Sequence, residues 1–217
     1  MHVHYDVPYT SPTGDGSNTS YFEQSAHGPD FQPKDPNVHK SFTTHQYLNK
    51  KLRWMTLGGQ YDWTNKVYPS EPSPAFPPDI KTLVEGIFPM KAEAAIVNLY
   101  SPGDTLSLHR DVSEECSEPL VSISLGCDGI FVVGLDGKGP HDEPRVAAIR
   151  LRSGDAVLMS GESRYAWHGV PKVIEGTCPD WMEDWPSGIE SVGQSYESWR
   201  GWMKGKRINL NVRQMFA

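Results

Sequence analysis

The sequence predicts one mainly β domain with flanking helices, and three observations carry this prediction. Its 217 residues are the length of one domain with an appendage. Between residues 93 and 170, short apolar runs recur at spacings of roughly 8–12 residues and are bounded by Gly, Pro or Asp, as in a β-sandwich or barrel. The hydrophobic fraction of 37% and the net charge of −7 fit a globular protein. The same charge argues against a polycation that binds nucleic acid non-specifically.

The elements follow in a clear order along the chain. Residues 1–53 are polar and rich in turns, so we expect an irregular arm that wraps the domain. From Asp79 the apolar residues follow helical spacing as far as Phe88. Strand-like runs come next, at 94–100, 106–109, 120–126, 130–135, 146–152, 156–160 and 207–215. Segment 175–205 interrupts this rhythm and holds four tryptophans, so we expect an insertion that packs through their rings against the β core and the arm.

Cysteine usage and the first residues bear on the compartment. Three cysteines are few and odd in number, which argues against a disulfide scaffold. The sequence shows neither a secretory signal nor an apolar run near the length of about 18 residues that a membrane span needs. We therefore expect a monomer in the nucleus or the cytoplasm, without membrane contact.

Two histidines and an aspartate form a candidate metal site. His109 and Asp111 stand two residues apart, so on a strand their side chains share one face. His168 follows 57 residues after Asp111. Two histidines and one carboxylate leave three coordination positions open, which suits a non-haem Fe(II) oxygenase. A zinc hydrolase would fit the same ligands, and unrelated polar residues can also produce a His-x-Asp pattern.

The closing strand carries two arginines and two asparagines on one face: Arg207, Asn209, Asn211 and Arg213. An edge strand with its polar face in water would show the same alternation. A guanidinium, however, grips a carboxylate with two parallel hydrogen bonds, which a lysine cannot do. We therefore favour a wall that binds a dicarboxylic co-substrate such as 2-oxoglutarate. Asn98 and Tyr100, on a predicted neighbouring strand, would add hydrogen-bond donors, although an ordinary polar strand end would look the same.

These motifs together resemble the AlkB family of Fe(II)/2-oxoglutarate dioxygenases. Asn98 and Tyr100, the His-x-Asp pair, the turn SGESR, HGVP from His168 and the strand RINLNVR occur in the order of that family. The resemblance covers about residues 54–217. Ser113, the SGESR turn and the long segment before the last strand are most similar to the group related to mammalian AlkB homologue 1.

The resemblance implies a double-stranded β-helix, or jelly-roll, core with the metal at one open end. It assigns His109, Asp111 and His168 to Fe(II). The residues it assigns to 2-oxoglutarate are Asn98, Tyr100, Arg207, Asn209 and Arg213, with Arg207 at the far carboxylate and Arg213 near the carboxylate beside the keto group. The implied reaction consumes O₂ and removes N-methyl groups from nucleobases in DNA or RNA, including tRNA. Its products are succinate, CO₂ and formaldehyde.

Substrate recognition is expected from a nucleotide-recognition lid near residues 54–72. By resemblance, Trp63 stacks on the target base and Tyr68 lies nearby, although Trp63 could equally pack on the β core. Ser113 stands where several repair members of the family carry a second aspartate, which argues against the repair of 1-methyladenine and 3-methylcytosine in single-stranded DNA. Two alternatives remain: a demethylase or hydroxylase of histones or other proteins, whose basic tails would suit the acidic chain, and a non-catalytic reader.

Overall fold

The computed structural model describes residues 4–6, 20–23, 31–60, 62, 73–112, 116–137, 139, 143–187 and 196–216. The chain divides into two units. The arm unit comprises Met1–Arg53 and Asp180–Lys204, and the sheet unit comprises Trp54–Pro179 and Gly205–Ala217. Among the described residues, no helix is long and apolar enough to cross a lipid bilayer.

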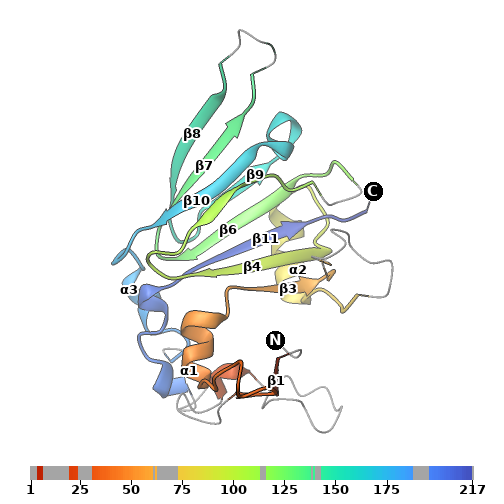
Figure 1. Ribbon diagram of the computed structural model, residues 1–217. Helices are drawn as coiled ribbons and strands as arrows, with labels where there is room; N and C mark the ends of the chain where they lie inside the picture. The colour runs from red at the N-terminus through yellow and green to blue at the C-terminus, as the bar shows by residue number, and fades with distance from the viewer. Residues whose placement is uncertain are drawn as a thin grey trace. The chain divides into compact units, whose positions relative to one another are not determined.

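The larger sheet of the sheet unit has five antiparallel strands. Their order is β3 (Trp54–Gly58), β4 (Ala94–Tyr100), β11 (Arg207–Arg213), β6 (Leu120–Gly126) and β9 (Ala156–Met159). The last strand of the chain therefore lies at the centre, paired along its whole length with β4 and β6 (Figure 1). This pairing excludes the alternative that β11 is an edge strand with one face in water.

The smaller sheet has four strands in the order β5 (Leu106–His109), β10 (Trp167–Val173), β7 (Gly129–Leu135) and β8 (Arg145–Leu151). Strand β10 was absent from the predicted runs because its sequence, WHGVPKV, contains Gly169 and Pro171. Gly169 is needed for the pairing with β5, since a Cβ there would lie 2.8 Å from the Leu106 carbonyl oxygen. The short 3₁₀ helix η3 (Gly161–Tyr165) leads into β10.

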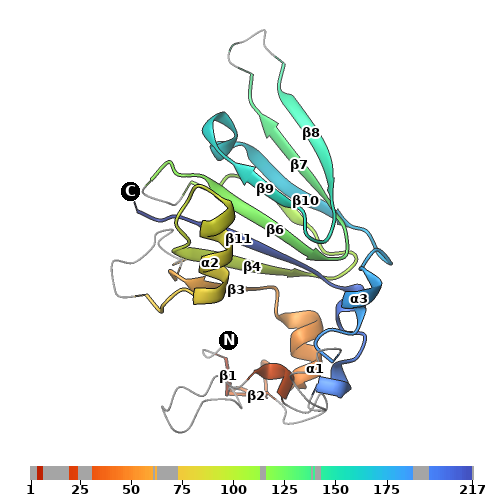
Figure 2. The ribbon, with the colours of Figure 1, turned by 180° about the vertical axis from the view of Figure 1, so that it is seen from behind.

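Two apolar clusters hold these layers together. The side chains of Leu120, Phe131 and Val170 belong to a cluster drawn from both sheets. On the opposite face of the larger sheet, helix α2 (Pro78–Ile87) contributes Val84 to a second cluster with Val212 of β11 (Figure 2). The helix predicted from Asp79 is thus confirmed, but Val84 is the one residue of α2 that is fully buried. The predicted fold class, a mainly β jelly roll with flanking helices, is confirmed.

The arm unit is built from short elements. They are β1 (Tyr5–Asp6), η1 (Tyr21–Glu23), β2 (Gln32–Pro33), α1 (Thr44–Gln46), the π-helical turn η2 (Tyr47–Lys51) and α3 (Asp180–Glu183); the 3₁₀ turn η5 (Met203–Gly205) leads toward β11. Helix α1 begins at a capping box in which Thr43 and Gln46 exchange hydrogen bonds between side chains and backbone. Such short elements need aromatic packing for stability, because they bury little surface of their own.

Phe22 is the centre of an aromatic cluster in the arm unit. Three of the four tryptophans in the 175–205 segment pack against its ring at centroid distances of 5.0–5.4 Å: Trp185, Trp199 and Trp202. The Trp199 indole also donates a hydrogen bond to the Phe22 carbonyl oxygen at 3.0 Å. The expectation that these rings join the segment to the N-terminal arm is confirmed for the three. It is wrong for Trp181, which is 79% exposed.

Trp199→Ala should lower the free energy of unfolding by about 3–5 kcal/mol, because the Trp199 side chain is only 2% exposed and its removal leaves a large cavity. Trp181→Ala is the matched control, with an expected change within about 0.5 kcal/mol. Urea unfolding of both full-length variants measures the difference. Equal destabilisation by the two substitutions would contradict the packing described for this cluster.

Candidate metal centre

A cavity of about 490 Å³ opens between the two sheets. Its lining includes most of the residues predicted to carry the chemistry: Asn98, His109, Asp111, His168, Arg207, Asn209 and Arg213. The larger sheet contributes the arginines and asparagines, whereas β5, the segment after it and β10 contribute the histidines and the aspartate. Leu120, Phe131 and Met159 supply an apolar part of the wall.

The three predicted metal ligands converge in this cavity. His109 and His168 face each other across the β5–β10 pair, with ring centroids 4.3 Å apart. The Nε2 atom of each imidazole lies 3.8 Å from a different carboxylate oxygen of Asp111. All three ligand atoms lie within 4.8 Å of one another. Two imidazole nitrogens and one carboxylate are the donor set of non-haem Fe(II) oxygenases.

Backbone carbonyls orient both imidazoles. The His109 Nδ1 atom lies 2.9 Å from the Ser107 carbonyl oxygen, and the His168 Nδ1 atom lies 3.1 Å from the Ala166 carbonyl oxygen. With the proton on Nδ1, each ring presents a bare Nε2 to the metal position. Burial also lowers the pKa of His168, which favours the neutral form that a metal requires.

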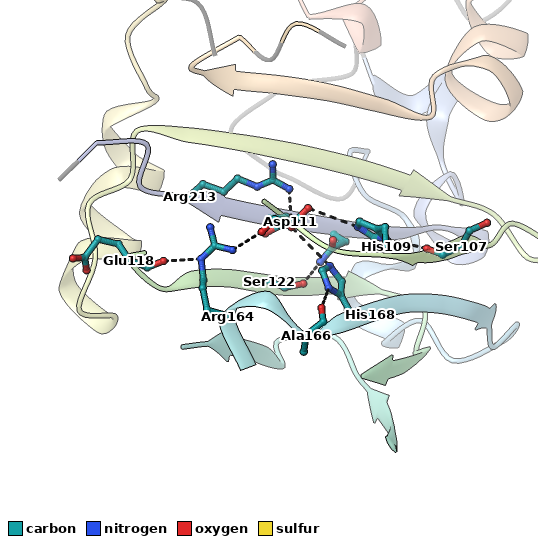
Figure 3. A network of polar contacts seen from close by, with 11 residues as sticks. Ser107, His109, Asp111, Glu118, Ser122, Arg164, Ala166, His168 and Arg213 are labelled. Carbon is teal, nitrogen blue, oxygen red and sulfur yellow. Dashed lines mark hydrogen bonds and ion pairs between the residues drawn. The ribbon is translucent and has the colours of Figure 1, made fainter. Parts of the chain in front are cut away.

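Asp111 is 7% exposed, and its carboxylate is held by two residues of β11, of which Figure 3 labels Arg213. Arg213 Nη2 forms an ion pair with Asp111 Oδ2 at 2.8 Å, and Asn211 donates a hydrogen bond to the same oxygen at 3.1 Å. Burial by itself would raise the pKa of Asp111. Arg213, the two histidines and the Asn211 hydrogen bond outweigh burial, so the pKa lies below its ordinary value. The carboxylate is therefore ionised and ready to bind a cation.

Arg164, which the sequence analysis left without a role, holds the backbone of the same segment. Its guanidinium is almost fully buried and donates to two carbonyl oxygens, that of Asp111 through Nη1 and that of Glu118 through Nε, each at 2.8 Å (Figure 3). Arg164 belongs to η3, four residues before His168. It thus links the positions of two of the predicted ligands. The arginine of the SGESR turn was the available signal, but only the folded chain shows what it contacts.

The buried guanidinium of Arg207 indicates that the cavity binds an anion. The Arg207 side chain is 1% exposed, and burial lowers its pKa. One nitrogen, Nη2, donates to the Ser124 hydroxyl at 2.9 Å, while Nε and Nη1 have no hydrogen-bond acceptor among the described residues. Gly129 makes room for this guanidinium, since a Cβ there would lie 2.6 Å from Arg207 Nε. A buried cation without a carboxylate fits a dicarboxylic ligand.

The other predicted co-substrate residues lie around Arg207 on β4 and β11. Asn209 donates to the Ser122 hydroxyl at 2.6 Å, so the serines of β6 orient the side chains of the neighbouring strand. Ser122 and Ser124 alternate with apolar residues in LVSISLG, a pattern from which sequence reasoning could have found them. Tyr100 lies beside the Arg207 guanidinium, and burial raises its pKa to about 12. Its hydroxyl has no partner among the described residues.

The predicted substrate residues Trp63, Tyr68 and Ser113 lie outside the described residues. Of the predicted lid, the described part begins as β3, which pairs with β4. The roles assigned to these residues stay predictions.

Comparisons with known proteins agree with this geometry. The sequence profile of the 2OG-Fe(II) oxygenase superfamily matches residues 15–213. A relative from Pyricularia oryzae, described as the N6-methyladenosine RNA demethylase ALKB1, is 53% identical over 232 residues, covering 99% of this chain and 65% of the relative. A relative from Cryphonectria parasitica, described as the N6-methyladenosine RNA demethylase ALKBH, is 52% identical over 228 residues, covering 99% of each chain. The chain thus spans about two thirds of the first relative and nearly all of the second.

The fold has a counterpart among solved structures. The structure of OsALKBH1 superposes with a TM-score of 0.55 and 24% sequence identity, covering 74% of this chain and 77% of that chain. At this identity the likeness concerns the fold. It agrees with the jelly-roll core formed by the two sheets.

Arg164→Lys should weaken metal binding by about 10- to 100-fold, because a single ammonium cannot span the two carbonyl oxygens that the guanidinium joins. Titration with Mn(II) measures the change, and thermal unfolding of the metal-free variant reports any loss of fold. Unaltered Mn(II) affinity would show that Arg164 has no part in positioning Asp111.

Arg207→Lys should raise the KM for 2-oxoglutarate at least about tenfold with a smaller effect on kcat, because a point cation loses the paired hydrogen bonds to a carboxylate. Arg207 is the better test than Arg213, which also forms an ion pair with Asp111. The readout is succinate formation at varied 2-oxoglutarate concentration. A KM equal to that of the parent protein would remove Arg207 from the co-substrate site.

Proposed function

Because the chain belongs to the AlkB family within the 2OG-Fe(II) oxygenase superfamily, we propose that it oxidatively demethylates N-methylated nucleobases in nucleic acid, with N6-methyladenine in RNA as the favoured substrate. The two fungal relatives described as N6-methyladenosine RNA demethylases support this choice, since each matches 99% of the chain. The names of the Pyricularia relative, ALKB1, and of the solved structure, OsALKBH1, agree with the proposal that this chain belongs to the group related to mammalian AlkB homologue 1.

One observation carries the proposal: the two-histidine, one-carboxylate cluster shares a single cavity with the buried cation of Arg207. A hydrolase with this cluster would need a water-activating metal but no dicarboxylate subsite. A reader with a purely structural metal would have no use for open coordination positions or for a buried guanidinium without an acceptor at two of its nitrogens. The combination fits an oxygenase that consumes a dicarboxylic co-substrate.

Some residues of the cavity bind the co-substrate, and others hold the metal ligand Asp111. Bound Fe(II) with 2-oxoglutarate and O₂ would supply the oxidising chemistry. Arg207 would bind the far carboxylate of 2-oxoglutarate, Arg213 would lie near the carboxylate beside the keto group, and Asn209 would lie between them. Asp111 stays ionised because Arg213 neutralises its charge. Leu120, Phe131 and Met159 form an apolar part of the cavity wall, which would limit the water in that part of the cavity.

The overall reaction balances without an additional reductant. One oxygen atom of O₂ enters the N-methyl group and leaves with its carbon as formaldehyde, while the nitrogen regains a proton. The other oxygen atom enters 2-oxoglutarate, which loses CO₂ and becomes succinate. An equimolar yield of formaldehyde and succinate is therefore the signature of coupled turnover.

The test compares single-stranded RNA that contains one N6-methyladenine with the same RNA unmodified, in the presence of Fe(II) and 2-oxoglutarate. We expect equimolar formaldehyde and succinate with the methylated RNA only, and Asp111→Ala should abolish both products. Parallel arms use N6-methyladenine in DNA, a methylated tRNA stem–loop and a trimethyllysine histone peptide. Stimulation by the peptide alone would overturn the proposal in favour of a protein substrate, and a lack of stimulated turnover with every oligonucleotide would also overturn it.

A further inference from the structure

We propose that Arg110 binds a backbone phosphate of the target nucleotide at the mouth of the metal cavity. The inference rests on the proposed function, because it assumes that the substrate is a nucleic acid. It adds a binding site for a phosphodiester, formed by Arg110 and held in place by Trp167.

The position of Arg110 is fixed by its neighbours. In the chain it stands between His109 and Asp111, and it is an exposed residue that belongs to the lining of the metal cavity. The guanidinium carbon lies 4.4 Å from the centre of the Trp167 ring, which is within cation–π distance. The Trp167 indole is fixed in turn by a 3.2 Å hydrogen bond to Asp136. The guanidinium is therefore held against the Trp167 indole, one residue along the chain from each of two predicted metal ligands.

Among the described residues, Arg110 has an aromatic partner but no acidic one. In the part of the chain that the structure describes, no carboxylate forms an ion pair with it. Two other exposed arginines differ in this respect. Arg145 pairs with Glu162 at 3.1 Å, and Arg150 pairs with Asp128 at 2.7 Å. Stacking on an indole occupies only a face of the guanidinium, so the N–H donors around its edge stay free for an anion.

Phosphate is the anion that the proposed substrate brings to this place. A base must leave its stack and enter the cavity for its methyl group to reach the metal. Only the base has to approach the metal position, so the sugar and phosphates of that nucleotide stay at the rim. The chain has a net charge of −7 and repels nucleic acid overall. A fixed cation at the point of entry offsets that repulsion where the target nucleotide must be held.

The test compares Arg110→Ala with the parent protein on two substrates, an RNA oligonucleotide with one N6-methyladenine and the free nucleoside N6-methyladenosine. The nucleoside has no phosphate. We expect the substitution to raise the KM for the oligonucleotide about tenfold more than the KM for the nucleoside. In equilibrium binding of a fluorescent single-stranded RNA, the slope of log K against log salt should become shallower by about 0.7, the value of one lost phosphate contact.

Arg145→Ala is the matched control, since it removes an exposed arginine of the smaller sheet that already has a carboxylate partner. It should change neither KM nor the salt slope. Trp167→Phe keeps an aromatic face under Arg110 and should retain most of the affinity, whereas Trp167→Ala should lose part of it.

Several outcomes would overturn the assignment. An equal rise in both KM values for Arg110→Ala would mean that Arg110 acts through the neighbouring metal ligands. An unchanged salt slope would exclude a phosphate contact. Loss of binding in Trp167→Ala without loss in Arg110→Ala would mean that the indole itself stacks on a base. RNA binding is measured without turnover, so the test of Arg110 stands apart from the test of demethylation.

Discussion

A carboxylate buried against a guanidinium is the constraint on which the site depends. Asp111 can remain ionised inside the protein because Arg213 lies 2.8 Å away and Asn211 donates to the same oxygen. Loss of either partner of such a pair costs about 3–5 kcal/mol, since the other charge stays buried and uncompensated. Arg213 ends the central strand β11, and Arg164 holds the backbone of Asp111 from η3. The metal position is therefore tied to both sheets and cannot move independently of them.

Much of this arrangement was predictable from patterns of short range. Alternation along single runs located β4, β6 and β11, and residues two apart placed His109 beside Asp111 and put both arginines of β11 on one face. Family resemblance supplied what alternation could not, namely the jelly-roll topology and the metal and co-substrate that the residues would serve. The helix α2 was predictable as well, because helical spacing of apolar residues is a local property.

The parts that were missed depend on contacts between distant residues. Strand β10 contains a glycine and a proline, and its pairing follows from the close approach of β5 at Gly169 rather than from propensity. The hydroxyls of Ser122 and Ser124 matter because β6 lies beside β11 in one particular register. Arg164 is 53 residues from Asp111. Propensity carries no information about which strands become neighbours, so these roles required the folded chain.

The alternation of β11 also limits how a protein of this design can evolve. Arg207, Asn209 and Arg213 face the cavity, while Leu210 and Val212 pack into the cluster beneath α2. Insertion or deletion of one residue within the strand would exchange the two faces, placing guanidinium groups in the apolar cluster and aliphatic groups in the ligand site. Insertions and deletions should therefore be selected against within β11 and tolerated in the loops around it. New ligand preferences would have to arise by substitution of the odd-numbered residues of β11, without a change in the length or the register of that strand.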